Sequence, residues 1–188
     1  MAREPVQAAK SSPAEKLRDE HHLKRGLREG HLIYPEGADI GESTSRVRTV
    51  DKPGEDKMKE EDRWGRMVVD YRLLNARTKE EPSSSEDADA MTRWLASTLW
   101  RSVADLLWGF NHLVLTKRSA ALMQIATSMG ILQPTVLGFG VHGGPAAMQK
   151  VVNAIFAEFR ETGILRTFID DTAVGTGTAY VARAKRTT

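Results

Sequence analysis

A small set of aspartates provides the residues most capable of chemistry in this sequence. Asp170 and Asp171 are adjacent, with the strand-favouring residues Phe168-Ile169 before them and Ala173-Val174 after them. Successive side chains on a strand point to opposite faces, so two neighbouring aspartates converge only where a turn interrupts the strand. The pattern predicts a β-hairpin with both carboxylates at its tip. Aspartate is also common in ordinary turns, so the pair alone does not establish a site.

A third aspartate strengthens this interpretation. Between residues 95 and 169 the only acidic residues are Asp105, Glu158 and Glu161. A carboxylate in such an apolar stretch is costly to bury unless another group compensates its charge. Two Mg²⁺ ions held about 3.5–4 Å apart need carboxylate oxygens from several elements. Asp105 on one strand and the aspartate pair on a hairpin meet that need, with Mn²⁺ as an alternative ion.

Several elements in the first half of the chain could support such a site. Ser12, Pro13 and Glu15 form a typical helix start, and the helix is expected to end at Gly26 or Gly30. The β-branched and aromatic content further on predicts strands at 47–50 and 66–72, joined through a hairpin tip at 51–57.

The second half alternates helices with strands. A helix is expected to begin after residues 86 and 87, with an apolar stripe formed by Ala88, Met91, Trp94, Leu95 and Leu99. Another is expected from Pro145 to Gly163, with one face formed by Met148, Val152, Ile155, Phe156 and Phe159. The predicted strands are 103–106, 113–115, 122–127, 135–137, 164–169 and 172–178. This order predicts an α+β fold in which an antiparallel sheet packs on helices.

Composition excludes several classes of protein. The 188 residues carry a net charge of +2 and include no cysteine, so disulfides and thiolate zinc sites are excluded. No apolar run reaches the roughly 18 residues that a membrane span requires, and no membrane partner is expected. The amino terminus lacks an apolar secretory core, and we expect an intracellular protein.

Four segments share one interpretation. Asp105 is followed four and five residues later by Gly109 and Phe110. Residues 66–75 read RMVVDYRLLN, residues 137–149 read LGFGVHGGPAAMQ, and residues 168–171 read FIDD. In order and spacing, these segments resemble the fingers motif and the palm motifs of retroelement reverse transcriptases, especially those of gypsy-type retrotransposons. Residues 27–33 are similar to the short entry segment that precedes them in that family.

The resemblance covers roughly residues 25–178 and implies the fingers and palm of an RNA-directed DNA polymerase. It divides the chain into a charged and partly disordered amino-terminal arm (1–24), a fingers-like segment (25–81), a palm-like segment (82–178) and a basic tail (179–188). Only 17 residues follow Asp171, so the later palm strands, the thumb and any RNase H or integrase domain are expected to be absent.

The family's mechanism implies roles for particular residues. Asp105, Asp170 and Asp171 would bind the two metal ions, which activate the 3′-hydroxyl of a primer and neutralise the triphosphate of a deoxynucleotide. The remaining candidates would bind the nucleotide: Arg66 and Lys59 through its triphosphate, Phe110 beneath its sugar, and Phe139 and Gly140 as lining of its pocket. The implied partners are an RNA or DNA template with its primer, dNTPs, and the remainder of a polyprotein or a host assembly.

Two departures from the family pattern affect the second palm motif. Gly138 stands where the family usually has proline, and Gly143 and Gly144 replace an Asn-Ala pair. The same glycines formally match a dinucleotide-binding fingerprint, but the chain lacks the β-α-β alternation that this site requires. Trp94 and Trp100 are predicted to be core residues rather than platforms for bases.

Two hypotheses about activity stay open. The intact aspartate trio favours a polymerase fragment, because a structural role would not need these residues. The short sequence after Asp171 favours an inactive remnant that serves as a structural or interaction protein. Whether this chain alone is an active nucleotidyltransferase is therefore left undecided by the sequence.

Overall fold

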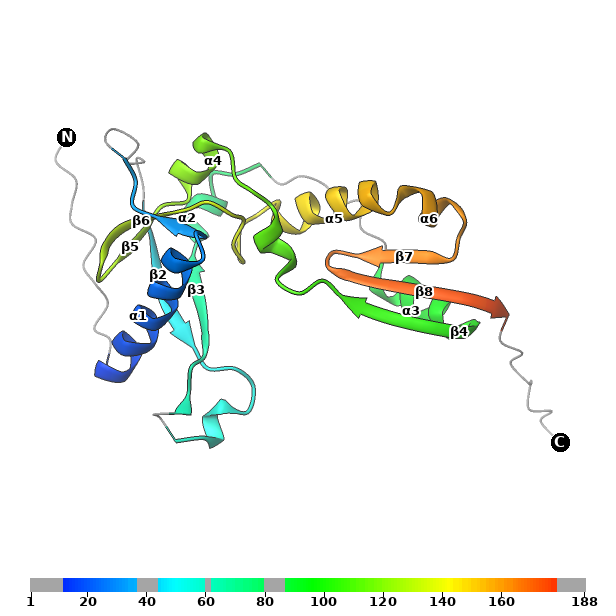
Figure 1. The fold of residues 1–188 in the computed structure, drawn as a ribbon, viewed down its shortest axis with the longest axis horizontal. Coiled ribbons are helices and arrows are strands. Elements are labelled where there is room, and N and C mark those ends of the chain that lie inside the picture. Colours follow the sequence, from blue (N-terminus) through cyan, green and yellow to red (C-terminus); the bar gives the residue numbers. More distant parts are fainter. Residues whose placement is uncertain (1–11, 37–43, 60–61, 80–86, 179–188) are drawn as a thin grey trace. The chain divides into compact units, whose positions relative to one another are not determined.

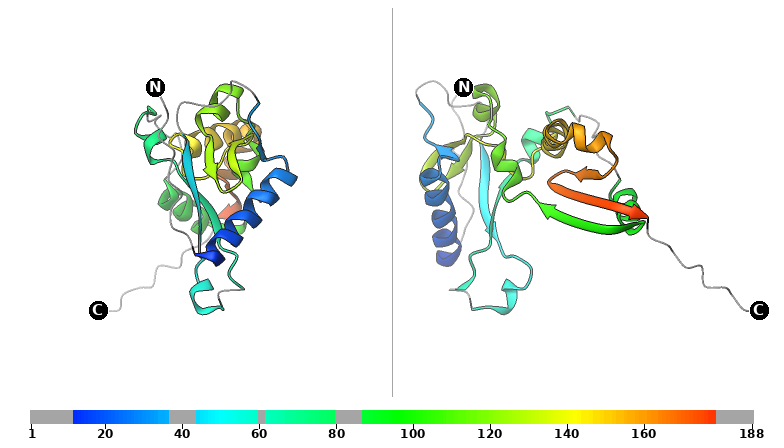
Figure 2. Two further views of the ribbon diagram at one scale, coloured as in Figure 1. Left: turned by 90° about the vertical axis from the view of Figure 1, so that its left-hand side faces the viewer. Right: turned by 45° about the vertical axis from the view of Figure 1, so that its right-hand side comes forward.

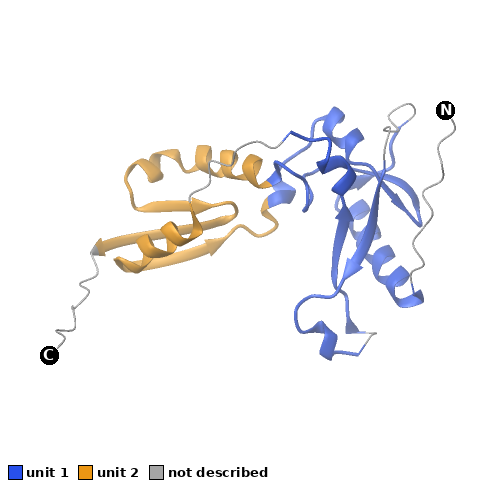
Figure 3. Cartoon of the chain, turned by 180° about the vertical axis from the view of Figure 1, so that it is seen from behind, with its two compact units in different colours: residues 1–79, 110–144 blue, residues 80–109, 145–188 orange. Residues whose placement is uncertain are grey.

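The computed structural model describes residues 12–36, 44–59, 62–79 and 87–178 (Figure 1). The chain forms two compact units, one of residues 1–79 with 110–144 and one of residues 80–109 with 145–188 (Figure 3). The predicted boundary after residue 81 lies close to the first break. Residues 110–144 cluster with the first unit, so the polypeptide passes between the units more than once.

The first unit contains a five-stranded sheet in the order β1-β6-β5-β2-β3. Its strands are β1 (Leu32–Ile33), β2 (Ser45–Val50), β3 (Arg66–Asp70), β5 (Ile125–Thr127) and β6 (Gly130–Pro134). All pairs are antiparallel except β2 with β5, which is parallel. The expected strand at 113–115 is reduced to a single bridge between Val114 and Val136.

Helix α1 (Pro13–Arg28) packs on this sheet (Figure 2). It begins at a capping box, because Ser12 Oγ accepts from the Glu15 N–H and Glu15 accepts from the Ser12 N–H. Leu23 of α1 is fully buried in a core with Leu32, Ile125 and Leu132. The second half of the predicted amino-terminal arm is thus an ordered, packed helix, whereas residues 1–11 lie outside the described residues.

The described residues of the first unit also include the short helices α2 (Arg72–Asn75), α4 (Lys117–Leu122) and η1 (Glu55–Lys57). Helix η1 lies in the connection between β2 and β3, where the sequence predicts a hairpin tip. The connection leads into β3 at Gly65, whose φ is +63°. A Cβ atom at this position would lie 2.5 Å from Thr49 Cγ2. Only glycine fits that position, because both the backbone conformation and the space exclude a side chain.

The second unit contains a three-stranded antiparallel sheet in the order β4-β8-β7. Its strands are β4 (Thr98–Asp105), β7 (Leu165–Phe168) and β8 (Asp171–Thr178), and its helices are α3 (Ala88–Ala96), α5 (Gly144–Ile155) and α6 (Ala157–Glu161). Helix η3 (Gly109–His112) marks the passage from this unit to the first. No helix among the described residues is long and apolar enough to cross a membrane.

Two predictions for this unit are wrong in detail. The helix expected from Pro145 to Gly163 is divided at Phe156 into α5 and α6, and Ile155 of the predicted apolar face is 67% exposed. Trp100, predicted as core, lies on β4 and is 72% exposed. Trp94 on α3 is half-buried, with the guanidinium of Arg166 5.0 Å from its ring centroid.

Candidate metal and nucleotide site

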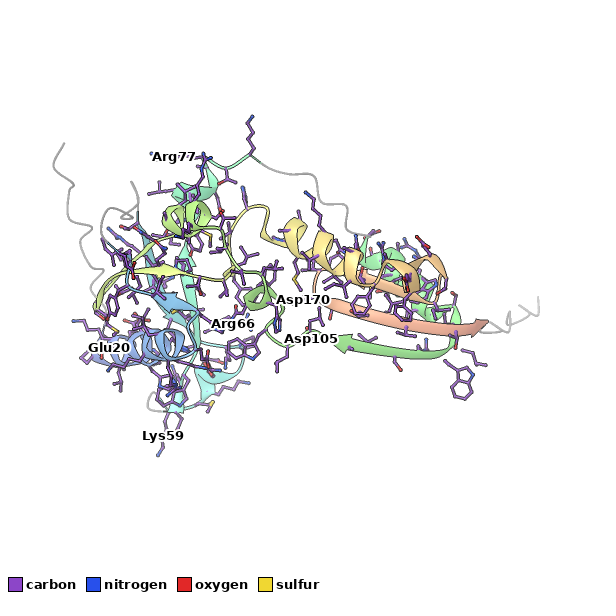
Figure 4. All side chains as sticks on the ribbon, turned by 45° about the horizontal axis from the view of Figure 1, so that its top comes forward. Glu20, Lys59, Arg66, Arg77, Asp105 and Asp170 are labelled. Carbon is purple, nitrogen blue, oxygen red and sulfur yellow. The ribbon has the colours of Figure 1, made fainter. Side chains whose placement is uncertain are left out.

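The three aspartates lie at one end of the sheet of the second unit. Asp105 is the last residue of β4 and Asp171 the first residue of β8, and the two are paired in register. Directly opposed residues of antiparallel strands project on the same face, so these two carboxylates share a face. Asp170 belongs to the two-residue turn between β7 and β8. Figure 4 labels Asp105 and Asp170 at this end of the sheet.

Hydrogen bonding and close packing join the turns on either side of the aspartates. The Leu106 N–H donates to the Asp170 carbonyl oxygen at 3.0 Å, which links the end of β4 to the hairpin tip. A Cβ atom at Gly109 would lie 3.1 Å from Asp170 Cβ and 3.0 Å from Met148 Cε. The glycine four residues after Asp105 therefore allows the two turns to approach each other.

Backbone strain in the described chain is concentrated beside these carboxylates. Among the described residues, the only non-glycine residues with positive φ are Trp108 at +60° and Ile169 at +57°. Trp108 follows Asp105 by three residues, and Ile169 directly precedes Asp170. Bulky and β-branched residues rarely adopt this conformation, and such strain is typical of functional sites.

The charges of the three carboxylates influence one another. Burial raises the pKa of the Asp171 carboxyl, and the negative charges of Asp170 and Asp105 raise it further. Like charges disfavour ionisation of a nearby carboxyl, so a bound cation would relieve the repulsion. Carboxylate oxygens are also the ligands that Mg²⁺ and Mn²⁺ prefer. The donor set therefore suits a hard divalent ion.

The three aspartates do not form a complete coordination site for a metal ion. Over the described ranges, no group of three or more His, Asp or Glu side chains is arranged to hold one ion together. Mg²⁺ usually retains several waters and binds proteins through one or two carboxylates plus substrate phosphates. An arrangement of separate carboxylates at a sheet end fits that mode of binding better than a preformed cage.

The predicted nucleotide-binding residues belong to the first unit. The rings of Phe110 and Phe139 lie 5.0 Å apart between centroids. Phe110 is 8% exposed and Phe139 is 52% exposed. Gly140 has a φ of +88°, and a Cβ atom there would lie 3.7 Å from the Val69 carbonyl oxygen. The structure thus brings these three candidates together near the end of β3.

The two basic candidates occupy different parts of the β2–β3 connection. Arg66 is exposed at the first residue of β3, and Lys59 is exposed in the loop that follows η1; both are labelled in Figure 4. Val69, beside Gly140, lies three residues beyond Arg66, which corresponds to about 10 Å along a strand. Arg66 and the Phe139–Gly140 loop therefore lie at different points along β3.

Asn75 and Gln149 lie within the sequence motifs but were not predicted to have a role. The Asn75 side chain donates to the Gly140 carbonyl and accepts from the His142 N–H, both at 2.8 Å. Asn75 thereby fixes the loop that carries Phe139 and Gly140. Gln149 is 1% exposed and bonds to the hairpin that carries the aspartates. The sequence signal that could have identified Gln149 was a long polar side chain on an otherwise apolar helix face.

Comparison with known proteins gives this geometry a context. No protein-family model matches the chain. The sequence is 26% identical over 153 residues to an enzymatic polyprotein of Cassava vein mosaic virus, covering 81% of this chain and 22% of that protein. It is 25% identical over 126 residues to the retrovirus-related Pol polyprotein from transposon 412 of Drosophila melanogaster, covering 67% of this chain and 10% of that protein.

Solved structures show the same fold. The prototype foamy virus protease–reverse transcriptase aligns over 92% of this chain with a TM-score of 0.71 and 21% identity, covering 21% of that chain. A foamy viral protease–reverse transcriptase solved in complex with double-stranded DNA aligns over 95% of this chain with a TM-score of 0.74 and 20% identity. The fold is thus similar to that of retroviral reverse transcriptases. The present chain spans less than a third of the length of each of these proteins.

Proposed function

We propose that this chain is the fingers-and-palm portion of an RNA-directed DNA polymerase encoded by a gypsy-type or related retroelement. The observation that carries the proposal is the meeting of Asp105, Asp170 and Asp171 at one sheet end, within a fold shared with reverse transcriptases. The motif resemblance and the two similar polyproteins support the same assignment. The substrates would be dNTPs and a primer annealed to an RNA or DNA template.

Asp105 and Asp170 would be the principal ligands of two Mg²⁺ ions, and Asp171 would complete the negative charge of the site. When bound, the ions would lower the pKa of the primer hydroxyl and neutralise charge that develops on the triphosphate. The pKa of Asp171 is raised first by burial and then by the charges of Asp170 and Asp105, and the second of these effects supports the assignment because a bound cation would offset it.

The residues of the first unit would bind the nucleotide. Arg66 carries a planar guanidinium suited to bidentate phosphate contacts, and Lys59 would add a second positive charge. Phe110 would lie beneath the sugar, where its ring leaves no room for a 2′-hydroxyl. Asn75 would hold Phe139 and Gly140 in place through its two backbone hydrogen bonds.

A chimeric polymerase tests the proposal. The chain would be fused to the later palm strands and thumb of a related reverse transcriptase and supplied with an RNA template, a DNA primer and Mg²⁺. We expect primer extension that Asp105→Asn abolishes. A folded chimera without extension, or extension that survives Asp105→Asn, would contradict the proposal.

The same chimera examines sugar selection. Phe110 is 8% exposed, so complete truncation to alanine would cost roughly 3–5 kcal/mol of stability. Phe110→Val is therefore the better variant. If the ring excludes a 2′-hydroxyl, ribonucleotide incorporation relative to deoxyribonucleotide should rise by roughly 10- to 200-fold. An unchanged ratio in a folded, active variant would assign Phe110 to the core alone.

A second candidate function is that of a polymerase-derived interaction protein. It is favoured by the exposed apolar side chains of the edge strand β4, where Leu99 is 59%, Trp100 72% and Val103 60% exposed. An exposed apolar edge strand is a template for pairing with another chain. Under this alternative, neutralising the three aspartates would leave the protein's interactions unchanged and no divalent cation would bind at them.

A further inference from the structure

A buried glutamine of the second unit, Gln149, uses both ends of its side-chain amide in hydrogen bonds. Gln149 lies on α5 and is 1% exposed, between the buried residues Met148 and Val152 of an amphipathic helix. Its side-chain oxygen accepts a hydrogen bond from the Ile169 N–H at 2.7 Å. Its side-chain nitrogen donates to Asn153 Oδ1 at 2.7 Å and to Thr167 Oγ1 at 3.0 Å.

The partners of Gln149 are themselves fixed. Thr167 is fully buried on β7, and its hydroxyl donates to Asn153 Oδ1 at 2.8 Å. Gln149 and Asn153 are four residues apart and so lie on one face of α5. A closed triangle of side-chain hydrogen bonds therefore orients the Gln149 amide, and its oxygen accepts from the Ile169 N–H of the hairpin turn. Satisfied networks of this kind are rigid because an unpaired buried polar group is costly.

The turn that Gln149 contacts is the strained one. Ile169 has a φ of +57°, which is unfavourable for a β-branched residue. Strain of this kind persists only where the surrounding structure holds it. The Ile169 N–H donates a hydrogen bond to Gln149. The next residue is Asp170, whose carbonyl oxygen accepts a hydrogen bond from the Leu106 N–H. The glutamine thus holds the backbone N–H of the strained residue that directly precedes Asp170.

Packing alone does not call for a glutamine at this position. A methionine would fill a similar volume on the buried face of α5 without any polar atom to satisfy. What a methionine could not supply is the acceptor for the Ile169 N–H. The hydrogen bond, rather than the bulk of the side chain, is what this residue contributes.

We infer that Gln149 is a positioning residue for the aspartate site: it clamps the Ile169 peptide and thereby holds Asp170 and Asp171 toward Asp105. The inference rests on the proposed metal-binding function of these aspartates. It assigns no contact between Gln149 and the metal, the nucleotide or the primer. Removal of a residue that orients a metal ligand without touching the metal typically changes metal affinity by about 10- to 100-fold.

The test compares Gln149→Met with Val152→Ala in the 188-residue chain. Both variants alter the buried face of α5, but only the first removes the hydrogen bond to Ile169. Two readouts are measured: the hydrogen-exchange rate of the Ile169 amide relative to the amides of β8, by NMR, and the affinity for Mn²⁺, by electron paramagnetic resonance. Melting temperatures show whether the two variants are equally destabilised.

In Gln149→Met we expect relative exchange at Ile169 to accelerate by roughly 3- to 10-fold, the loss of one hydrogen bond. Mn²⁺ affinity should fall by about tenfold or more. In Val152→Ala the melting temperature should fall while both readouts stay at their wild-type values. Wild-type exchange at Ile169 in Gln149→Met, or equal loss of Mn²⁺ affinity in both variants, would overturn the inference.

The two claims can fail separately. If the wild-type chain binds no Mn²⁺ at these aspartates, the proposed metal function fails, and with it the purpose assigned to Gln149. Acceleration confined to Ile169 would then still establish that Gln149 holds the turn.

Discussion

The negative charge of Asp171 lowers the stability of the folded protein. Its pKa is raised by burial and by the charges of Asp170 and Asp105. A folded-state pKa above the ordinary 3.8 means that the folded protein holds this proton more tightly than the unfolded chain does. The contribution of Asp171 to folding stability therefore decreases as the pH rises from about 3.8 through its folded pKa.

The variant Asp171→Asn tests the direction of this pH dependence of folding stability. In EDTA at neutral pH, we expect the variant to be slightly more stable than the wild type, by up to about 0.5 kcal/mol, since the carboxyl is exposed and solvent screens its charge. The difference should vanish below a pH of about 3.8. Urea unfolding across this pH range measures both effects. A variant less stable than the wild type at every pH would mean that Asp171 has a net favourable partner.

At the scale of elements, local pattern predicted most helices and strands, and tertiary packing explains the misses. The capping box of α1, the strand β3 and the hairpin β7–β8 all follow from signals within a few residues. The single bridge at Val114 and the break at Phe156 do not, because strand pairing and helix division depend on distant partners. Residue spacing placed Leu99 on a helix face, whereas pairing with β8 extends β4 to include it.

The candidate site was predictable to a different degree in each of its parts. The sequence proposed Asp105 from its isolation in an apolar stretch, and Asp170 and Asp171 from their position between two strand-favouring segments. Their convergence required the register of β4 with β8, which no local signal supplies. The contacts of Gln149 with Ile169 join residues 20 positions apart, so their role became visible only in three dimensions.

Gly109→Ala tests the packing of the two turns. A Cβ atom at this position would press on Asp170 Cβ at 3.1 Å, which can move only with the turn. We expect stability to fall by about 1 kcal/mol and Mn²⁺ affinity to fall by about tenfold. Gly138→Ala is the matched control, because its added Cβ would meet nothing within 4 Å and its φ is not positive. Equal Mn²⁺ affinity in both variants would show that the turns are not tightly coupled.

At the scale of the whole molecule, the charge pattern predicts how nucleic acid would bind. Each phosphate neutralised on duplex DNA contributes about −0.9 to the slope of log K against log salt. The chain has 27 Lys and Arg residues against 25 Asp and Glu residues, so its acidic groups offset much of the attraction to phosphates. We expect weak binding with a slope no steeper than about −4.

Fluorescence anisotropy with a labelled duplex, measured at several salt concentrations, gives this slope. About eight or more phosphate contacts on the duplex would give a slope near −7 and would refute the expectation. Such a result would mean that this chain carries a complete duplex-binding surface of its own.

The central claim is that Asp105, Asp170 and Asp171 together form a divalent-cation site, and a Mn²⁺ titration tests it most directly. Free Mn²⁺ is followed by electron paramagnetic resonance for the wild type, Asp105→Asn, Asp170→Asn and the control Asp89→Asn, which alters an exposed aspartate on α3 of the same unit. The account predicts that the control binds like the wild type, while Asp105→Asn and Asp170→Asn each lose at least about tenfold in affinity. Equal affinity in all four proteins would contradict it.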